Sequence, residues 1–185
     1  MKDNNLKWKV GERKLLLHTP VFDVNVQHEI APNGVEGDYI AMTAPDWVQT
    51  IAVYEGQFVL VRQWRHSSET VSLEFPGGVA DEGEDPAESA SRELLEETGF
   101  KVGRLTHLGS VSPNPALFCN RFHVYLAEEL TQTGAQHLDD DELLTYELMP
   151  VDEVVASYGT GEFSHALMGT ALMLYLRYTM KERKP

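Results

Sequence analysis

The sequence predicts an α/β fold, in which a mixed sheet carries helices on its faces and a small N-terminal antiparallel β region precedes it. Two observations support this prediction. Strand patterns dominate the first half of the chain, and helical patterns flank the strands of the second half. The 185 residues suffice for one compact domain with a sizeable core and a small appended region. We therefore expect residues 1–45 to form the N-terminal β region and residues 46–185 to form the main domain.

The expected strands follow one another along the chain. Apolar residues alternate at Phe22, Val24 and Val26, which places one side of that segment inward. Turns such as Pro32-Asn33-Gly34 and Pro76-Gly77-Gly78 separate the strand segments. The predicted strands cover residues 15–17, 21–26, 39–43, 48–54, 58–61, 71–75, 106–111, 122–127 and 143–148.

The clearest helix is predicted from Pro86 to Thr98. Asp85 is a good N-cap because its side chain can accept hydrogen bonds from free backbone N–H groups, and proline suits the first helical position. Gly99 suits the left-handed position that ends a helix. Both ends of this helix are therefore specified by the sequence. Two further helices are predicted over residues 151–158 and 164–181.

The composition argues against several classes of partner. Lys and Arg number 15 against 29 Asp and Glu, a formal net charge of −14, so no nucleic acid partner is expected, because such binding neutralises phosphates with Lys and Arg. The most apolar stretch, residues 166–178, lacks the roughly 20 apolar residues that cross a bilayer, so no membrane partner is expected. Cys119 is the single cysteine and the N-terminus shows no signal-peptide pattern, which predicts a cytoplasmic protein without disulfides.

Acidic residues are concentrated on the predicted helix and the loop before it. Glu93, Glu96 and Glu97 are spaced by three and four residues, which places their carboxylates on one stripe of the helix. Like charges on adjacent turns oppose helix formation, and crowding raises carboxylate pKa values. A hard divalent cation such as Mg²⁺ or Mn²⁺ would compensate, because it prefers oxygen ligands. The alternative interpretation is a solvated acidic helix face.

The segment that contains this stripe carries a longer motif. Gly78 is followed after five residues by Glu84, and after seven more by Arg92-Glu93-Leu94-Leu95-Glu96-Glu97-Thr98-Gly99-Phe100. The string resembles, at every defined position, the Nudix box of enzymes that hydrolyse a nucleoside diphosphate linked to another moiety. The resemblance implies a Nudix α/β/α sandwich whose box carboxylates hold one to three Mg²⁺ ions against a diphosphate.

The resemblance also implies a role for each carboxylate of the motif. Glu93 and Glu97 would be direct metal ligands, and Glu96 would be a ligand or a water-mediated partner. A backbone carbonyl near Gly77 or Gly78 would complete the ligand set.

Other residues of the motif are expected to shape it. Arg92 would orient Glu96 by a charge-assisted hydrogen bond, and Glu84 would hold the loop by accepting backbone donors. Gly78 and Gly99 are expected to be structural.

A carboxylate must also take a proton from the attacking water. In some Nudix branches this base belongs to the box, and Glu96 is counted among the candidate catalytic residues. In the ADP-ribose-hydrolysing branch the base comes from a downstream acidic loop. An acidic polar loop is expected here over residues 128–141, and the candidate segment for the base is Asp139-Asp140-Asp141-Glu142 at its end. We predict Glu142 as the base, with Asp139 or Asp141 as the alternatives.

Three segments outside the box resemble the ADP-ribose pyrophosphatase branch. They are Val61-Arg62-Gln63-Trp64-Arg65, Leu73-Glu74-Phe75-Pro76-Gly77-Gly78 and Pro113-Asn114-Pro115. The resemblance implies Mg²⁺-dependent hydrolysis of the diphosphate bond of ADP-ribose or a related nucleoside diphosphate sugar, giving AMP and ribose 5-phosphate from ADP-ribose. The alternatives are another nucleotide substrate, namely GDP-mannose, a dinucleotide or a damaged nucleotide, or a non-catalytic nucleotide-binding sensor.

Substrate contacts are predicted from the same segments. Arg65 would bind phosphate or ribose, Glu74 would support the terminal ribose or the metal site, and Pro115 lies where a proline accompanies ADP-ribose activity in this branch. The seven histidines show no spacing that suggests zinc, so we interpret them as structural or surface residues. Aromatic residues that could stack an adenine are Tyr39, Trp47, Trp64 and Phe118.

The N-terminal strands are too few to form an independently stable sheet, because small sheets need further strands or a helix to cover them. Members of this branch commonly exchange N-terminal segments in a dimer. We therefore expect a homodimer.

Overall fold

The structure is a computed structural model that describes residues 6–139 and 142–182. It comprises two compact units. One contains the described residues up to Pro45 together with Ser112–Arg121, and the other contains Asp46–Val111 together with the described residues from Phe122 onward. The N-terminal unit thus includes a segment from far along the chain, which no sequence pattern had indicated.

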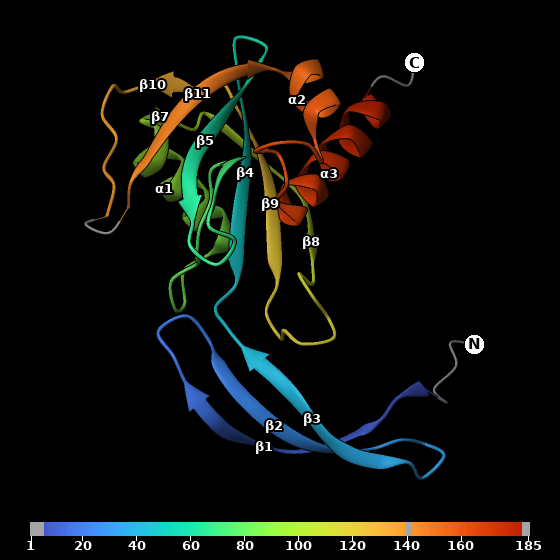
Figure 1. Ribbon diagram of the computed structural model, residues 1–185. Coiled ribbons are helices and arrows are strands. Elements are labelled where there is room, and N and C mark those ends of the chain that lie inside the picture. Colours follow the sequence, from blue (N-terminus) through green and yellow to red (C-terminus); the bar gives the residue numbers. More distant parts are fainter. Residues whose placement is uncertain (1–5, 140–141, 183–185) are drawn as a thin grey trace. The chain divides into compact units, whose positions relative to one another are not determined.

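The N-terminal unit is built on three antiparallel strands, β1 (Lys9–His18), β2 (Asp23–Ile30) and β3 (Glu36–Thr43), in the order β1-β2-β3 (Figure 1). The segment Ser112–Arg121 joins β3 through the backbone of Met42, whose N–H donates to Leu117 O at 2.7 Å and whose carbonyl accepts from Cys119 N–H at 3.0 Å.

The second unit contains a six-stranded sheet. Its strands are β4 (Trp47–Tyr54), β5 (Gln57–Arg65), β6 (Thr70–Glu74), β8 (Arg104–Val111), β9 (Phe122–Glu128) and β11 (Leu144–Pro150). The order is β11-β5-β4-β9-β8, with β6 paired to β5. The central pair β4 and β9 is parallel and the other pairs are antiparallel. The sheet is therefore mixed, as predicted.

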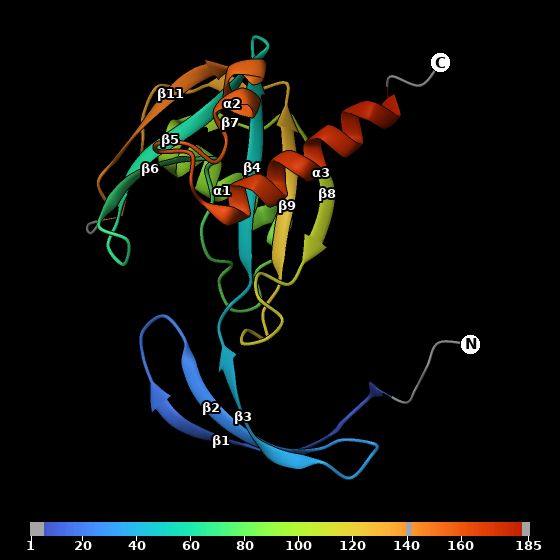
Figure 2. The same ribbon diagram turned by 45° about the vertical axis from the view of Figure 1, so that its right-hand side comes forward.

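Helices cover both faces of this sheet (Figures 1 and 2). On one face, α1 (Pro86–Thr98) buries Leu94 in a cluster with Ala52 and Val59. On the other face lie α2 (Val151–Ser157) and α3 (Ala166–Glu182), which pack over alternate strand residues in a second cluster. The α/β/α sandwich with an added antiparallel β region confirms the predicted fold class.

One small sheet differs from the prediction. Strand β7 (Phe100–Lys101) pairs with β10 (Thr131–Gln132), within the segment expected to be an acidic loop. Two-residue strands leave no readable alternation of apolar and polar residues, so sequence patterns miss them. No helix in the described part of the chain is long and apolar enough to cross a membrane.

Candidate active site

Helix α1 is fixed in place by its ends and by its buried side. The Asp85 carboxylate accepts a hydrogen bond from Ala87 N–H at 2.8 Å, and Gly99 ends the helix with φ of 71°. Ala90 and Leu94 are wholly buried. Because capped ends and a buried apolar stripe determine how the helix is rotated, the position of its acidic stripe follows from the sequence of the helix itself.

The acidic stripe meets a close-packed glycine pair after β6. Gly77 N–H donates to Glu97 Oε2 at 2.9 Å. A Cβ on Gly78 would lie 2.6 Å from the carboxyl carbon of Glu93, and a Cβ on Gly77 would lie 2.2 Å from the carbonyl oxygen of Val48. A Cβ on Gly77 would meet backbone, and a Cβ on Gly78 would fit only if the carboxyl end of Glu93 moved. The glycines therefore let α1 and β4 approach this loop from both sides.

Arg92 links the other carboxylates of the motif. Its Nε and Nη2 donate to the two oxygens of Glu84, each at 3.1 Å, and its Nη1 donates to Glu93 Oε1 and Glu96 Oε2, each at 3.0 Å. Hydrogen bonds from Arg92 and Ser89 lower the pKa of Glu84 to about 2. One guanidinium thus holds both the loop before the helix and two glutamates of the stripe.

Glu97 is buried and Glu93 is partly buried, and both have raised pKa values. Burial raises the pKa of Glu93 to about 7, against the opposing effect of Arg92. Burial also raises the pKa of Glu97 well above its usual value, against the N–H of Gly77, and the charge of Glu142 raises both pKa values further. The sequence indicated crowding as the cause, but desolvation is the larger one.

A divalent cation fits these donors chemically. Positive charge would stabilise the carboxylates of Glu93 and Glu97, whose ionised form is disfavoured by desolvation. No group of three or more Asp, Glu, His or Cys side chains is already arranged as a metal site among residues 6–139 and 142–182. Hard cations such as Mg²⁺ are commonly held by one or two carboxylates together with water and substrate phosphates, without a full protein cage. The Gly78 carbonyl, a predicted ligand, accepts from Val48 N–H at 3.0 Å and keeps one lone pair.

The downstream acidic segment contributes Glu142. This residue is exposed, and its N–H donates to Asp139 O at 3.0 Å while its own Oε2 accepts from Asp139 N–H at 3.3 Å. Its charge acts on both Glu93 and Glu97, so it lies within electrostatic reach of the box. Asp141, the other alternative for the base, lies outside the described residues.

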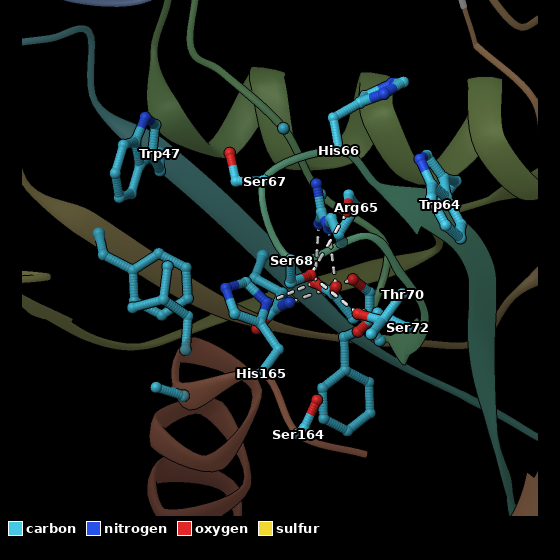
Figure 3. A pocket seen from close by; sticks show the side chains of 18 of the residues that line it. Trp47, Trp64, Arg65, His66, Ser67, Ser68, Thr70, Ser72, Ser164 and His165 are labelled. Atoms are coloured by element: carbon cyan, nitrogen blue, oxygen red, sulfur yellow. Dashed lines mark hydrogen bonds and ion pairs between the residues drawn. The ribbon is translucent and has the colours of Figure 1, made fainter. Parts of the chain in front are cut away.

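A cavity of about 650 Å³ adjoins the glycine pair (Figure 3). Gly77 and Gly78 line one part of it, and Trp47 and Trp64, two of the predicted stacking residues, line others. The remaining wall comes from the end of β5, the turn after it, β6 and the start of α3. The cavity therefore borders the glycine pair, where Gly77 N–H bonds Glu97.

A buried carboxylate organises the polar side of this cavity. Glu74 is 1% exposed, and Arg65 donates to it with Nε to Oε1 and Nη2 to Oε2, both at 2.8 Å. His165 Nδ1 forms a further hydrogen bond with Oε2. Burial alone would raise the pKa of Glu74, but the bonds from Arg65 and His165 lower it to about 2. The structure thus brings together the predicted substrate residues Arg65 and Glu74.

Three predicted substrate residues lie in the other unit. Pro115 and the stacking candidate Phe118 belong to Ser112–Arg121, and Tyr39 lies on β3. Their roles stay predictions.

His165 is the residue that sequence reasoning missed. We interpreted the histidines as structural or surface residues, but this one lines the cavity and bonds Glu74, 91 residues earlier in the chain. No local pattern marks such a contact. A signal available in the sequence was its position directly before the last helix, where a side chain can project past the end of the helix.

The fold and site define an α/β/α sandwich in which a helix bearing three glutamates lies beside a glycine loop. The NUDIX domain family matches residues 45–168, and the chain belongs to this family. It is 33% identical to ADP-ribose pyrophosphatase of Bacillus subtilis (strain 168) over 142 residues, which cover 76% of this chain and 77% of that protein. It is 29% identical to ADP compounds hydrolase NudE of Escherichia coli (strain K12) over 144 residues, 77% of each chain.

A solved structure shows the same fold. The crystal structure of an ADP compounds hydrolase superposes with a TM-score of 0.86 at 24% sequence identity, over 100% of both chains. The predicted family and the ADP-ribose pyrophosphatase-like branch are confirmed, and the chain is a Nudix pyrophosphohydrolase.

Proposed function

We propose that this protein hydrolyses the diphosphate bond of ADP-ribose or a related nucleoside diphosphate sugar, with Mg²⁺ as cofactor. ADP-ribose would give AMP and ribose 5-phosphate. The observation that carries the proposal is the cavity in which Arg65 lies on one side and the glycine pair in contact with Glu93 and Glu97 lies on the other. The names of the Bacillus subtilis and Escherichia coli relatives support an ADP-linked substrate.

Arg65 is suited to bind the diphosphate. Its Nε and Nη2 each donate to Glu74, which leaves the N–H groups of Nη1 for phosphate oxygens. The bidentate pair holds the guanidinium plane in one orientation, so little side-chain entropy is lost when the anion binds.

Glu93 and Glu97 would hold Mg²⁺, with Glu96 as a direct or water-mediated partner and the Gly78 carbonyl as a further ligand. When bound, Mg²⁺ neutralises the diphosphate and lowers the pKa of the attacking water. Arg92 keeps Glu93 and Glu96 oriented. Mn²⁺ has the same preference for oxygen ligands and is the expected substitute.

Glu142 would act as the general base. It takes one proton from water, whose oxygen attacks a phosphorus of the diphosphate in line with the bridging oxygen. The bond from that phosphorus to the bridging oxygen breaks, and the bridging oxygen leaves on the other phosphate. Exposure of Glu142 to solvent lets the captured proton pass to bulk water before the next turnover.

A panel of substrates tests the proposal. Each nucleoside diphosphate derivative is incubated with the protein and with a phosphatase that releases phosphate only from the cleaved products, with Mg²⁺ and with a chelator. We expect the highest kcat/KM for ADP-ribose or another ADP-linked sugar, and no phosphate release under chelation. A higher kcat/KM for GDP-mannose or a dinucleotide would reject the substrate, and turnover under chelation would reject the cofactor.

A further inference from the structure

The role of Nδ1 of His165 in its hydrogen bond follows from its partner. Glu74 is ionised across the neutral pH range because its pKa is about 2, so its oxygens can only accept hydrogen bonds. Nδ1 of His165 must therefore carry the proton in the bond to Oε2. The other nitrogen, Nε2, is then an acceptor in a neutral imidazole and a donor in an imidazolium. No described residue forms a hydrogen bond with Nε2.

The imidazole is also placed next to the predicted phosphate-binding group. Nη2 of Arg65 and Nδ1 of His165 bond the same oxygen of Glu74, so the guanidinium and the ring lie side by side. Figure 3 shows both side chains in the cavity, with the ring of His165 projecting from the start of the helix toward Arg65. The ring lines the cavity and is one-third exposed.

We propose that His165 is a substrate-binding residue whose Nε2 forms a hydrogen bond with a pentose hydroxyl of the nucleoside diphosphate substrate. A phosphate held by Arg65 carries its sugar one ester bond away, next to the imidazole. A hydroxyl can donate to a neutral imidazole and accept from an imidazolium, so it suits Nε2 in either state. The role requires the diphosphate to bind at Arg65, so the assignment rests on the proposed function.

The variant His165→Asn distinguishes a residue that binds the sugar from one that only positions Glu74. An asparagine amide can replace the Nδ1 donor to Glu74 but has no group in the place of Nε2. A residue that only positions Glu74 would be rescued by this change. A residue that binds the sugar would not be rescued.

The test measures dissociation constants by titration calorimetry in the presence of Mg²⁺. The parent probe is the ADP-ribose analogue with a methylene bridge between the phosphates, which cannot be cleaved. Two further probes are deoxy versions of it: one lacks the hydroxyls of the adenosine ribose, and the other lacks those of the terminal ribose. For the wild type we expect one deoxy probe to bind about 10-fold more weakly than the parent probe, the value of one hydrogen bond. His165→Asn should weaken the parent probe about 10-fold and leave that deoxy probe unchanged. The deoxy probe whose dissociation constant does not change in His165→Asn identifies the ribose that His165 contacts.

A matched control is His107→Asn, which changes an exposed histidine on β8 that bonds Ser110 and should leave all dissociation constants unchanged. Equal weakening of all three probes by His165→Asn, unchanged binding, or no binding of the parent probe to the wild type would each overturn the proposal. Binding that depends on His165 without hydrolysis of ADP-ribose would instead reject the proposed function and keep the sugar contact.

Discussion

At the scale of single residues, Gly77 and Gly78 are required for different reasons. A side chain on Gly77 would meet backbone, because its Cβ would lie 2.2 Å from Val48 O and 2.8 Å from Gln49 Cα. A side chain on Gly78 would meet only the carboxyl end of Glu93. A strand backbone cannot give way without loss of its hydrogen bonds, whereas the end of a glutamate side chain can turn aside.

Alanine at Gly77 should therefore reduce stability, whereas alanine at Gly78 should reduce activity. Gly77→Ala should lower the free energy of unfolding by about 1–3 kcal/mol through overpacking. Gly78→Ala should keep nearly wild-type stability but reduce kcat/KM by at least about 10-fold, because it would displace Glu93 from its proposed place among the metal ligands. Denaturant unfolding and the phosphatase-coupled assay check both values. Equal losses of stability in the two variants would contradict this account.

Two isosteric substitutions, Glu142→Gln and Asp139→Asn, distinguish which of these residues is the general base. As the base, Glu142→Gln should lower kcat by about 10²–10⁴-fold while KM and the Mg²⁺ concentration for half-maximal rate stay close to wild type. Asp139→Asn is the matched control and should keep its rate, because the bond to Glu142 uses the backbone N–H of Asp139. Steady-state kinetics decide between them. A large loss in Asp139→Asn alone would transfer the role of base to that residue.

At the scale of elements, Glu74 ties three segments together. It lies on β6, Arg65 lies at the end of β5, and His165 directly precedes α3. The carboxylate is buried and its pKa is lowered from 4.5 to about 2. As pH falls, the unfolded chain takes up this proton before the folded chain does. The stabilisation from Glu74 is therefore complete above about pH 5 and is lost as pH falls toward 2.

This linkage predicts an acid-dependent difference between two chains. Between pH 6 and pH 3 the wild type should lose about 2 kcal/mol more unfolding free energy than Glu74→Gln, which has no proton to gain at this position. Urea unfolding in the presence of a chelator at several pH values measures the difference and removes any contribution from bound metal. Parallel pH profiles for the two chains would show that Glu74 is not held in its ionised form.

Sequence patterns predicted those elements that carry local signals. The ends of α1 are marked by Asp85 and Gly99 within the segment itself, and the glutamate stripe follows from helical spacing. The pairing of β7 with β10 and the contact of His165 with Glu74 join distant segments. Such contacts depend on how the sheet and helices pack. The burial that raises the pKa of Glu97 likewise depends on tertiary packing.

At the scale of the whole molecule, the N-terminal sheet leaves apolar side chains open to solvent. Every residue of β1 is exposed, and Leu15, Leu16 and Leu17 are each 57–58% exposed. Exposed apolar patches on a small sheet indicate a surface that another chain covers. The three clusters of buried apolar residues all lie in the second unit, so β1 to β3 have little core of their own.

We predict that a second copy of the chain covers this sheet in a homodimer. Light scattering at micromolar concentration should give twice the 20.8 kDa mass of one chain. β1 bulges between Leu15 and Leu17, which pair with the adjacent residues Asn25 and Val24 of β2 and so point to opposite faces of the sheet. Leu15→Glu and Leu17→Glu together therefore place a carboxylate on each face and should shift the mass to that of one chain. Met173→Glu changes an equally apolar, 65% exposed residue on α3 and should leave the dimer intact. A single-chain mass for the wild type would reject the dimer, whereas dissociation by both variants would mean that the contact extends to α3.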